Sequence, residues 1–569
     1  MQRHKFFAIF LVHVFLFQTV IFAQTTVPAK AVYSAPKADI DKIMDEGMNR
    51  SQVMNHIGYL TDVIGPRLTN SPNQRRASQW AKETFAKWGM KSYLEAFGPW
   101  GRGWSLKSFN ASVTEPTYQP VLAFPNAWST STKGAVTSEV IFLDVNEDKD
   151  LEKYKGKLKD KIVMFNPPRE LKNDPLGLGA PFSDLELTNL ANFVKPTTPT
   201  RTADETDASR LAFAKRFALL FRTQIFLATE SPAVVIENSQ RGSGGSVMVH
   251  NASMMFPPDP NLTKTLTGAL PWTKKAEPYI FPTMTMANED YNRLVRLNRQ
   301  GVTPKMTVDI QTQFHDEDEM GYNTIAEIPG TDPKLKDEIV MLGAHLDSWH
   351  TGSGATDNAT GSGAMMEAVR IIAASGLKPR RTIRVALWNG EEQGLHGSKA
   401  YVEKHFAQMP KPTKEVPKPT PIKGADFDKL SAYFNMDNGA GRIRGIYLME
   451  NAAAKPIFDE WLKPFNSVGA NTTTMMSRGS TDHVSFDNVG LPGFGFIQDP
   501  LNYFLDFGLR THHTNQDKLD AVNPDNMKQA ATVIAAFVYQ TAMMDEKIPR
   551  KSMTPTAKNM TQIDNQTAQ

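Results

Sequence analysis

The chain contains no cysteine, and this absence excludes disulfides, thiolate metal sites, cysteine nucleophiles and a lipidated cysteine. Neither sign of charge is in excess: 63 Lys and Arg residues face 60 Asp and Glu residues, a formal net charge of +3. A near-neutral balance offers no electrostatic basis for binding nucleic acid or an anionic membrane. We therefore expect neither of them as a partner.

Long hydrophobic runs are scarce, and the only clear one lies at the N-terminus. Residues 6–22 are almost all apolar, Arg3 and Lys5 precede them, and Ala23-Gln24 is a plausible cleavage point. This pattern is typical of a signal peptide over residues 1–23. An uncleaved anchor is the alternative, because about 17 apolar residues are near the lower limit for a membrane span. In both cases we expect an exported protein, periplasmic or secreted, and cleavage would leave no stable membrane span.

The remaining length predicts more than one domain, because 569 residues exceed what a single core usually organises. Residues 24–37 resemble a linker, and residues 38–119, helical from Ile40 to about Met90, are expected to begin the main domain. Short β-rich runs at 139–143, 161–165 and 246–250, around a partly helical stretch at 185–222, predict a separate module over 120–313. Residues 314–545 would complete the main domain, and the polar residues 546–569 would form a disordered tail.

The region from 314 to 545 alternates strands with helices. Its expected strands are 338–342, 382–388, 430–436 and 445–449, and its expected helices are 358–374, 394–405 and 527–544. Such alternation predicts an α/β fold with a mostly parallel mixed sheet flanked by helices, into which the β-rich module is inserted. Ligands of such sheets bind at the carboxyl ends of the strands. The Pro-rich run 410–421 is expected to be a surface insertion.

Polar residues follow these strands where ligands are expected. His345 and Asp347 follow the first strand, Glu391 and Glu392 the second, and Asp437 the third. Asp357 lies in a Gly-rich turn before a helix, and His513 lies in a His-rich run downstream. Taken singly, each has an ordinary alternative: a solvated strand-end histidine, an N-cap aspartate or a pair of solvated acids.

The set as a whole indicates a two-metal hydrolase. Seven of the 12 histidines fall between positions 345 and 513. Imidazole and carboxylate ligands suit zinc, although cobalt or manganese could replace it. One carboxylate of the adjacent pair Glu391-Glu392 could hold a metal while the other moves a proton. Asp347 is placed to orient the imidazole of His345, and Asp357 could bridge two ions.

At these residues the chain resembles the M28 family of zinc peptidases, and within it the branch that includes carboxypeptidase Q. The motifs that carry the resemblance are Gly343–Ser348, Gly354–Gly361, Asn389–Gly394, Met436-Asp437, Ser480–His483 and His512–Thr514, with Gly65–Ser71 extending it upstream. The resemblance implies two Zn²⁺ ions bound by His345, Asp357, Glu392, Asp437 and His513, with Asp357 as the bridge. It implies Glu391 as the general base and Asp347 as the acid that orients His345. It also implies that the β-rich module is a protease-associated domain, which in relatives covers the cleft or supports a homodimer.

The predicted function is therefore an exported di-zinc exopeptidase or dipeptidase that acts on short peptides. Candidate substrate-binding residues are Asn358, Asp482, His483, Arg478, Tyr503 and His512, the last two also as donors to the oxyanion; Asn438 and Arg510 are further candidates for the substrate's terminal groups. Three alternatives remain at this point. They are a glutaminyl-cyclase-like acyltransferase with one zinc, a non-catalytic binding protein on the same fold, and a hydrolase of a non-peptide amide or phosphoester.

Overall fold

The computed structural model describes residues 32–171, 182–195, 203–257, 259–266, 268–417, 419–501, 503 and 510–551. The predicted signal peptide at 1–23, most of the linker and residues 552–569 of the predicted tail lie outside these ranges. Among the described helices, none combines the length and the apolar character that a membrane crossing needs.

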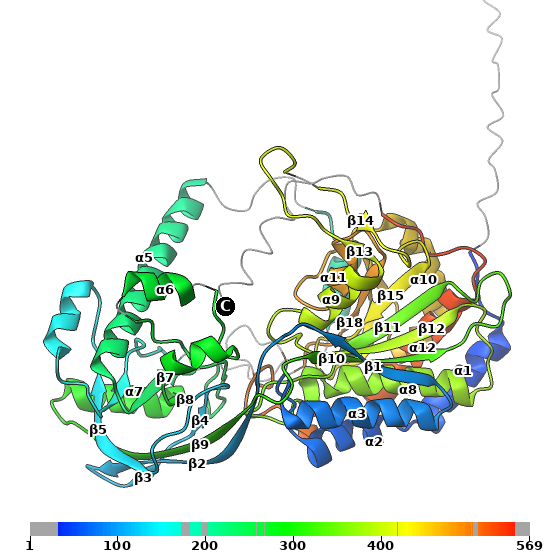
Figure 1. The fold of residues 1–569 in the computed structure, drawn as a ribbon. Coiled ribbons are helices and arrows are strands. Elements are labelled where there is room, and N and C mark those ends of the chain that lie inside the picture. Colours follow the sequence, from blue (N-terminus) through cyan, green and yellow to red (C-terminus); the bar gives the residue numbers. More distant parts are fainter. Residues whose placement is uncertain are drawn as a thin grey trace, which may run out of the picture.

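Two eight-stranded sheets organise the described chain (Figure 1). The first sheet has, in spatial order, β1 (Lys91–Phe97), β10 (Gly321–Ile328), β12 (Thr382–Trp388), β11 (Ile339–His345), β15 (Leu430–Asn435), β18 (Gly493–Gln498), β16 (Ile443–Tyr447) and β17 (Thr472–Thr474). Its central strands β12, β11, β15 and β18 are parallel. β1 and β10 are antiparallel to their neighbours, and β16 is antiparallel to β18 but parallel to β17. The predicted α/β class is thus confirmed.

Helices cover both faces of this sheet. Successive residues of a strand point to opposite faces, and in the central strands the apolar residues on both faces are buried against helices. In β12, Val385 and Leu387 belong to the larger core, while Ala386 and Trp388 belong to the smaller one. The larger core includes residues of α1 (Lys37–Asn49), α2 (Val53–Gly58), α3 (Pro72–Lys87), α8 (Thr360–Ala374), α10 (Lys455–Leu462) and α12 (Pro524–Met543). The smaller one includes residues of α9 (His396–His405) and α11 (His483–Asp487). Figure 1 shows α1–α3, α8 and α12 along one face, and α9 and α11 on the other. Every residue of β11 is buried, as expected for a central strand covered on both faces.

The second sheet belongs to a module that lies beside the first (Figure 1). Its spatial order is β3 (Gln119–Pro120), β2 (Gly103–Glu115), β9 (Lys305–His315), β5 (Val136–Phe142), β6 (Ile162–Met164), β7 (Val234–Asn238), β8 (Thr283–Met286) and β4 (Ala123–Pro125). Its helices are α4 (Asp184–Ala191), α5 (Ala203–Glu230), α6 (Pro260–Leu266) and α7 (Asn288–Arg299). We call residues 103–315 the second module.

The structure places the edges of this module differently from the expected range 120–313. β2 pairs with β9 from Gly103 opposite His315 to Glu115 opposite Lys305, so the second sheet begins upstream of residue 120. Lys, Ser and Asn interrupt the apolar pattern of β2, which hides its strand character in the sequence. The expected strand at 246–250 is not part of either sheet. Backbone groups of Val247 and Val249 bond to residues 513–515 instead of to a neighbouring strand. The Pro-rich run 410–421 connects the two-stranded ribbon of β13 (Ala407–Gln408) and β14 (Ile422–Lys423).

A buried arginine joins the N-terminal helices to the loop after β11. The guanidinium of Arg67, on a side chain with no exposed surface, donates to the carbonyl oxygens of Leu346 at 2.7 Å, Ser353 at 2.8 Å and Gly354 at 2.7 Å. It also donates to the carbonyl oxygens of Leu60 and Gly65. Burial lowers the pKa of Arg67 to about 10, so it remains charged at neutral pH. The guanidinium of Arg67 therefore fixes the backbone of the loop between β11 and α8.

Replacing Arg67 by Ala should lower the free energy of unfolding by about 3 kcal/mol or more, because each buried carbonyl that loses its donor costs about 1–3 kcal/mol. Urea denaturation followed by circular dichroism would measure it. Arg67→Lys should recover only part of the loss, since an ammonium cannot reproduce the planar set of donors. Arg222→Ala, which removes an exposed ion pair with Asp148, is the control and should change stability by less than about 1 kcal/mol. Equal effects of Arg67→Ala and Arg222→Ala would contradict this role.

Candidate metal centre

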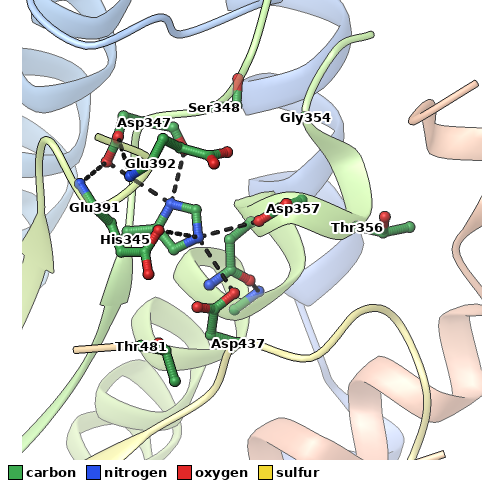
Figure 2. A network of polar contacts seen from close by, with 12 residues as sticks. His345, Asp347, Ser348, Gly354, Thr356, Asp357, Glu391, Glu392, Asp437 and Thr481 are labelled. Carbon is green, nitrogen blue, oxygen red and sulfur yellow. Dashed lines mark hydrogen bonds and ion pairs between the residues drawn. The ribbon is translucent and has the colours of Figure 1, made fainter. Parts of the chain in front are cut away.

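Three neighbouring strands deliver the first group of side chains. His345 is the last residue of β11, Asp437 lies two residues after β15, and Glu391 and Glu392 follow β12. Because β11 pairs in parallel with both β12 and β15, the carboxyl ends of all three meet at one edge. Figure 2 shows His345, Asp437, Asp357 and Glu391 converging at this edge.

Asp357 lies between two histidines that come from distant parts of the chain. Its Oδ1 is 3.1 Å from Nε2 of His345, and its Oδ2 is 3.1 Å from Nε2 of His513. Asp437 Oδ1 lies 3.2 Å from Nε2 of His345, and Glu392 Oε2 lies 3.0 Å from Nε2 of His513. The site therefore has two halves that share one carboxylate, each with one imidazole and one further acid.

Glu391 lies slightly farther from the imidazole of His345 than Asp357 and Asp437 do. Glu391 Oε2 is 3.9 Å from Nε2 of His345, farther than either Asp357 or Asp437. Its side chain keeps 10% of its surface exposed, against 2% for Glu392. The two adjacent acids thus face different halves of the site with different access to solvent.

Asp347 fixes the turn that carries these two glutamates. Its carboxylate accepts hydrogen bonds from the backbone N–H groups of Glu391 and Glu392, each at 3.3 Å, and from the hydroxyl of Thr69 at 2.8 Å. Nδ1 of His345 is 2.9 Å from the backbone carbonyl oxygen of Asp347, but 3.7 Å from its carboxylate. The backbone carbonyl of Asp347 is thus the closer partner of the His345 imidazole, and the carboxylate of Asp347, the acid predicted to orient that ring, also helps to raise the pKa of His345.

Asp517 holds Asp357 in the same way from the other side. It accepts from the backbone N–H and the hydroxyl of Thr356, at 2.6 and 2.8 Å, and from the backbone N–H of Asp357 at 3.1 Å. Burial, together with the nearby charge of Asp357, raises the pKa of Asp517 to about 7. These bonds hold the segment η4 (Ala355–Ala359), in which Asp357 and Asn358 have non-helical backbone angles and which leads into α8.

The negative charges of the carboxylates favour a cation near the imidazole nitrogens of His345 and His513. Burial by itself would lower the pKa of His345, yet the carboxylates of Asp437, Glu391 and Asp357 raise it well above 6.5. The pKa of His513 is raised to about 10 against burial, by Glu392 and Asp357. Burial and the charge of Asp357 raise the pKa of Glu392 to about 7. In each case the acids favour positive charge, which a divalent cation can supply in place of a proton.

The donor set fits zinc. Zinc accepts imidazole nitrogen and carboxylate oxygen at about 2.0–2.2 Å, so neighbouring donors in a tetrahedral shell are about 3.3 Å apart. The separations of 3.0–3.2 Å in both halves are close to that spacing. Oε1 of Glu392 is buried and has no hydrogen-bond partner, as expected of an atom free to coordinate. His345, Asp357 and Glu392 also offer donor atoms within 4.8 Å of one another, as do His345, Glu391 and Asp437.

The structure brings only some of the proposed substrate-binding residues to the centre. His512 stacks on His513 with ring centroids 3.7 Å apart, and Tyr503 packs edge-on against His512 at 4.8 Å. Asp482 is fully buried at the start of α11 and its charge acts on both Glu391 and His345. Burial raises the pKa of Asp482 to about 7.

The other proposed substrate-binding residues are engaged in the protein itself. The amide of Asn358 donates to the carbonyl of Met436 and accepts from the N–H of Gly361, both at 2.9 Å. Nε2 of His483 is 2.8 Å from the carbonyl oxygen of Arg478, and burial lowers the pKa of His483 to about 4. Asn358 and His483 are therefore positioned as parts of the scaffold. Arg510, a further candidate for binding a terminal group of the substrate, donates to the side-chain oxygen of Gln516 at 3.3 Å.

Several residues around the centre were not expected from the sequence to take part. Arg67 lies inside the motif Gly65–Ser71, and Asp517 follows the motif His512–Thr514 by three residues, so these motifs were the available signal. Trp349 and His250 flank His513, with ring centroids 6.0 and 5.8 Å away. His250 comes from the second module, and no local pattern connects it to a residue more than 260 positions downstream.

Comparison with known proteins agrees with this geometry. Residues 323–538 match the model of peptidase family M28. Carboxypeptidase Q of Mus musculus is 24% identical over 510 residues, which cover 89% of this chain and 88% of the mouse protein. Among solved structures, a peptidase M28 precursor from Shewanella amazonensis SB2B has a TM-score of 0.60 at 22% identity, covering 91% of this chain and 99% of that one. BSAP, a zinc aminopeptidase from Bacillus subtilis, has a TM-score of 0.52 at 16% identity, covering 87% of this chain and 96% of its own.

The two structural similarities concern the fold. The family assignment rests on the matched region, which contains His345, Asp357, Glu391, Glu392, Asp437 and His513, and on the relation to carboxypeptidase Q over most of both chains. The resemblance found in the sequence is thereby confirmed. The region of residues 323–538, which holds these six residues, is a peptidase of family M28.

Proposed function

We propose that this protein is a di-zinc exopeptidase or dipeptidase that hydrolyses peptide bonds of short peptides. One observation carries the proposal: the two oxygens of Asp357 are each 3.1 Å from an imidazole nitrogen, one of His345 and one of His513. A carboxylate shared in this way suits two cations held side by side.

Each half of the centre would hold one ion. His345, Asp437 and Oδ1 of Asp357 would bind the first, and His513, Glu392 and Oδ2 of Asp357 the second. Zinc bound there supplies Lewis acidity, which lowers the pKa of an attacking water and polarises the scissile carbonyl. The absence of thiolate ligands leaves cobalt and manganese as possible substitutes.

Glu391 is the residue proposed to move the proton. Its carboxylate is farther from Nε2 of His345 than the carboxylates of Asp357 and Asp437 are, and part of its side chain is exposed. Burial, with the charges of Asp437, Asp482 and Glu392, raises its pKa well above 4.5 against the effect of His345, so its carboxylate is a stronger base than usual. Glu391 would accept a proton as the water oxygen bonds to the carbonyl carbon. It would then give that proton to the amine nitrogen as the C–N bond breaks.

A short peptide is the proposed substrate, because the names of the relatives agree on peptides but not on the end recognised. One is a carboxypeptidase and another an aminopeptidase. Asp482 is our candidate for attracting a free amino group, since it is buried and its charge acts on His345 and Glu391 in the centre. His512 and Tyr503 are the candidates for contacting the carbonyl oxygen, since His512 stacks on His513 and Tyr503 packs against His512. Arg478, part-buried near His483, is a candidate for a carboxylate.

The N-terminal sequence supports export, since a basic start and an apolar run precede Ala23. We also propose a homodimer, and the only support for it is the resemblance to M28 peptidases.

Substituting Glu391 by Gln should reduce kcat by about 10²–10⁴, because the amide cannot take a proton, while two zinc ions remain bound. Steady-state kinetics with a dipeptide and metal analysis by mass spectrometry would measure both quantities. Asp357→Ala should instead lose zinc. Glu403→Gln, an exposed glutamate in α9, is the matched control and should keep both rate and zinc.

Near wild-type turnover in Glu391→Gln would remove Glu391 from this role. One zinc per wild-type chain would favour a cyclase-like acyltransferase. Absence of both zinc and hydrolysis would favour a binding protein.

A panel of dipeptides with free, N-blocked and C-blocked ends should separate the exopeptidase from other amide hydrolases. Blocking at least one end should lower kcat/KM by about 10-fold or more, because a site that pairs with a charged terminus is left with an unpaired polar group. The panel should be assayed after chelation and restoration of zinc, with the chelated enzyme as the blank. Equal rates on free and doubly blocked peptides would contradict exopeptidase action.

A further inference from the structure

A segment of the second module lies directly against the loop that carries His513. Residues 245–250, here called the clamp segment, run beside residues 510–515. Met248 and Thr514 form an isolated antiparallel bridge, and the N–H of Val249 donates to the carbonyl of His513 at 3.4 Å. The hydroxyl of Ser246 donates to the carbonyl of Arg510 at 3.3 Å. The clamp segment thus bonds the His513 loop along its length.

Asn515 makes the most specific of these contacts. Its side-chain oxygen accepts from the N–H of Val247 at 2.8 Å, and its side-chain nitrogen donates to the carbonyl of Gly245 at 3.2 Å. Its own N–H donates to the carbonyl of Val247 at 3.3 Å. One residue, two positions after His513, therefore joins the loop to the clamp segment through three hydrogen bonds.

The clamp segment is fixed on its other side to the second module. The N–H of Met248 donates to the hydroxyl oxygen of Ser239, just after β7, at 2.9 Å. Val247 and Val249 form a small buried cluster with Ala287, just after β8. The carbonyl of His250 accepts from the N–H of Ala127 at 3.0 Å. A continuous series of contacts therefore links the second sheet to His513.

His513 needs such external support. Its backbone has φ 59°, in the left-handed region that most side chains avoid, and it belongs to no helix or strand. His345, by contrast, ends the fully buried central strand β11. Aromatic packing adds to the support, since the rings of His250 and Trp349 flank that of His513. On the side of the first sheet the loop is tied further along, where Asp517 bonds to Thr356 and Asp357, four residues after His513.

We infer that the second module positions the metal ligand His513, and that Asn515 is the positioning residue that transmits this. The inference rests on the proposed function, because it concerns the ion that His513 and Glu392 would hold. The half of the centre built on His345 and Asp437 should not depend on Asn515.

The test is a titration of zinc into the metal-free full-length protein in zinc-buffered solutions, without reference to activity. Substituting Asn515 by Ala should weaken one of the two zinc affinities by about 10-fold or more, as loss of residues that orient a ligand usually does, and leave the other unchanged. His513→Ala gives the reference for a protein with a single zinc. Asn298→Ala is the matched control, because Asn298 also bonds two backbone groups, Phe142 N–H and Leu294 C=O, but only within the second module. It should keep both affinities.

Asn515→Asp keeps the acceptor for Val247 but places an oxygen against the carbonyl of Gly245, so an intermediate loss is expected. If Asn515→Ala does not fold by circular dichroism, the Asp variant decides. Two unchanged zinc affinities in a folded Asn515 variant would overturn the inference. A loss at both zinc sites, or the same loss in Asn298→Ala, would also overturn it, since the effect would then be general. Fewer than two zinc ions on the wild-type protein would overturn the proposed function itself, and with it this inference.

Discussion

The carboxylate of Asp357 is the group on which the arrangement of the centre depends. It is buried, and each of its oxygens lies 3.1 Å from an imidazole. Glu392 and Asp437 complete the two halves, so several acids are held close together with little water. Such crowding is unfavourable unless positive charge and donors compensate it. The raised pKa values of His345 and His513 show how strongly the acids attract a proton, and the same attraction is available to metal ions.

The surrounding structure supplies the fixed donors that this crowding requires. Asp347 and Asp517, themselves acids, do not face the centre with free oxygens; they accept backbone N–H groups of Glu391, Glu392 and Asp357. Arg67 holds the carbonyl groups of the intervening loop. The ligands are thereby held through their backbones, so their side chains remain available for coordination. This separation of supporting acids from coordinating acids explains why the centre contains more carboxylates than two metal ions need.

The sequence was sufficient to predict the part of the centre that depends on strands. The runs before His345, Glu391 and Asp437 are mainly apolar, as is typical of buried central strands, and adjacent parallel strands bring their ends together. Other features depend on contacts between distant segments and leave no local pattern. β2 is recognised only through its pairing with β9, and residues 246–250 have the β-branched, apolar composition of a strand but bond to a loop. Asn358 has the sequence context of a substrate-binding residue, yet its amide is used by Met436 and Gly361.

The two halves of the centre differ in what positions them, and this difference follows from the topology. His345 and Asp437 come from neighbouring strands of one sheet, so their relative position is fixed once that sheet forms. Glu392 shares this origin, but its partner His513 lies on a loop that bonds to the second module. An ion held by Glu392 and His513 would therefore require both modules in their mutual arrangement. The second module is in this sense part of the construction of the centre, in addition to any role in covering it.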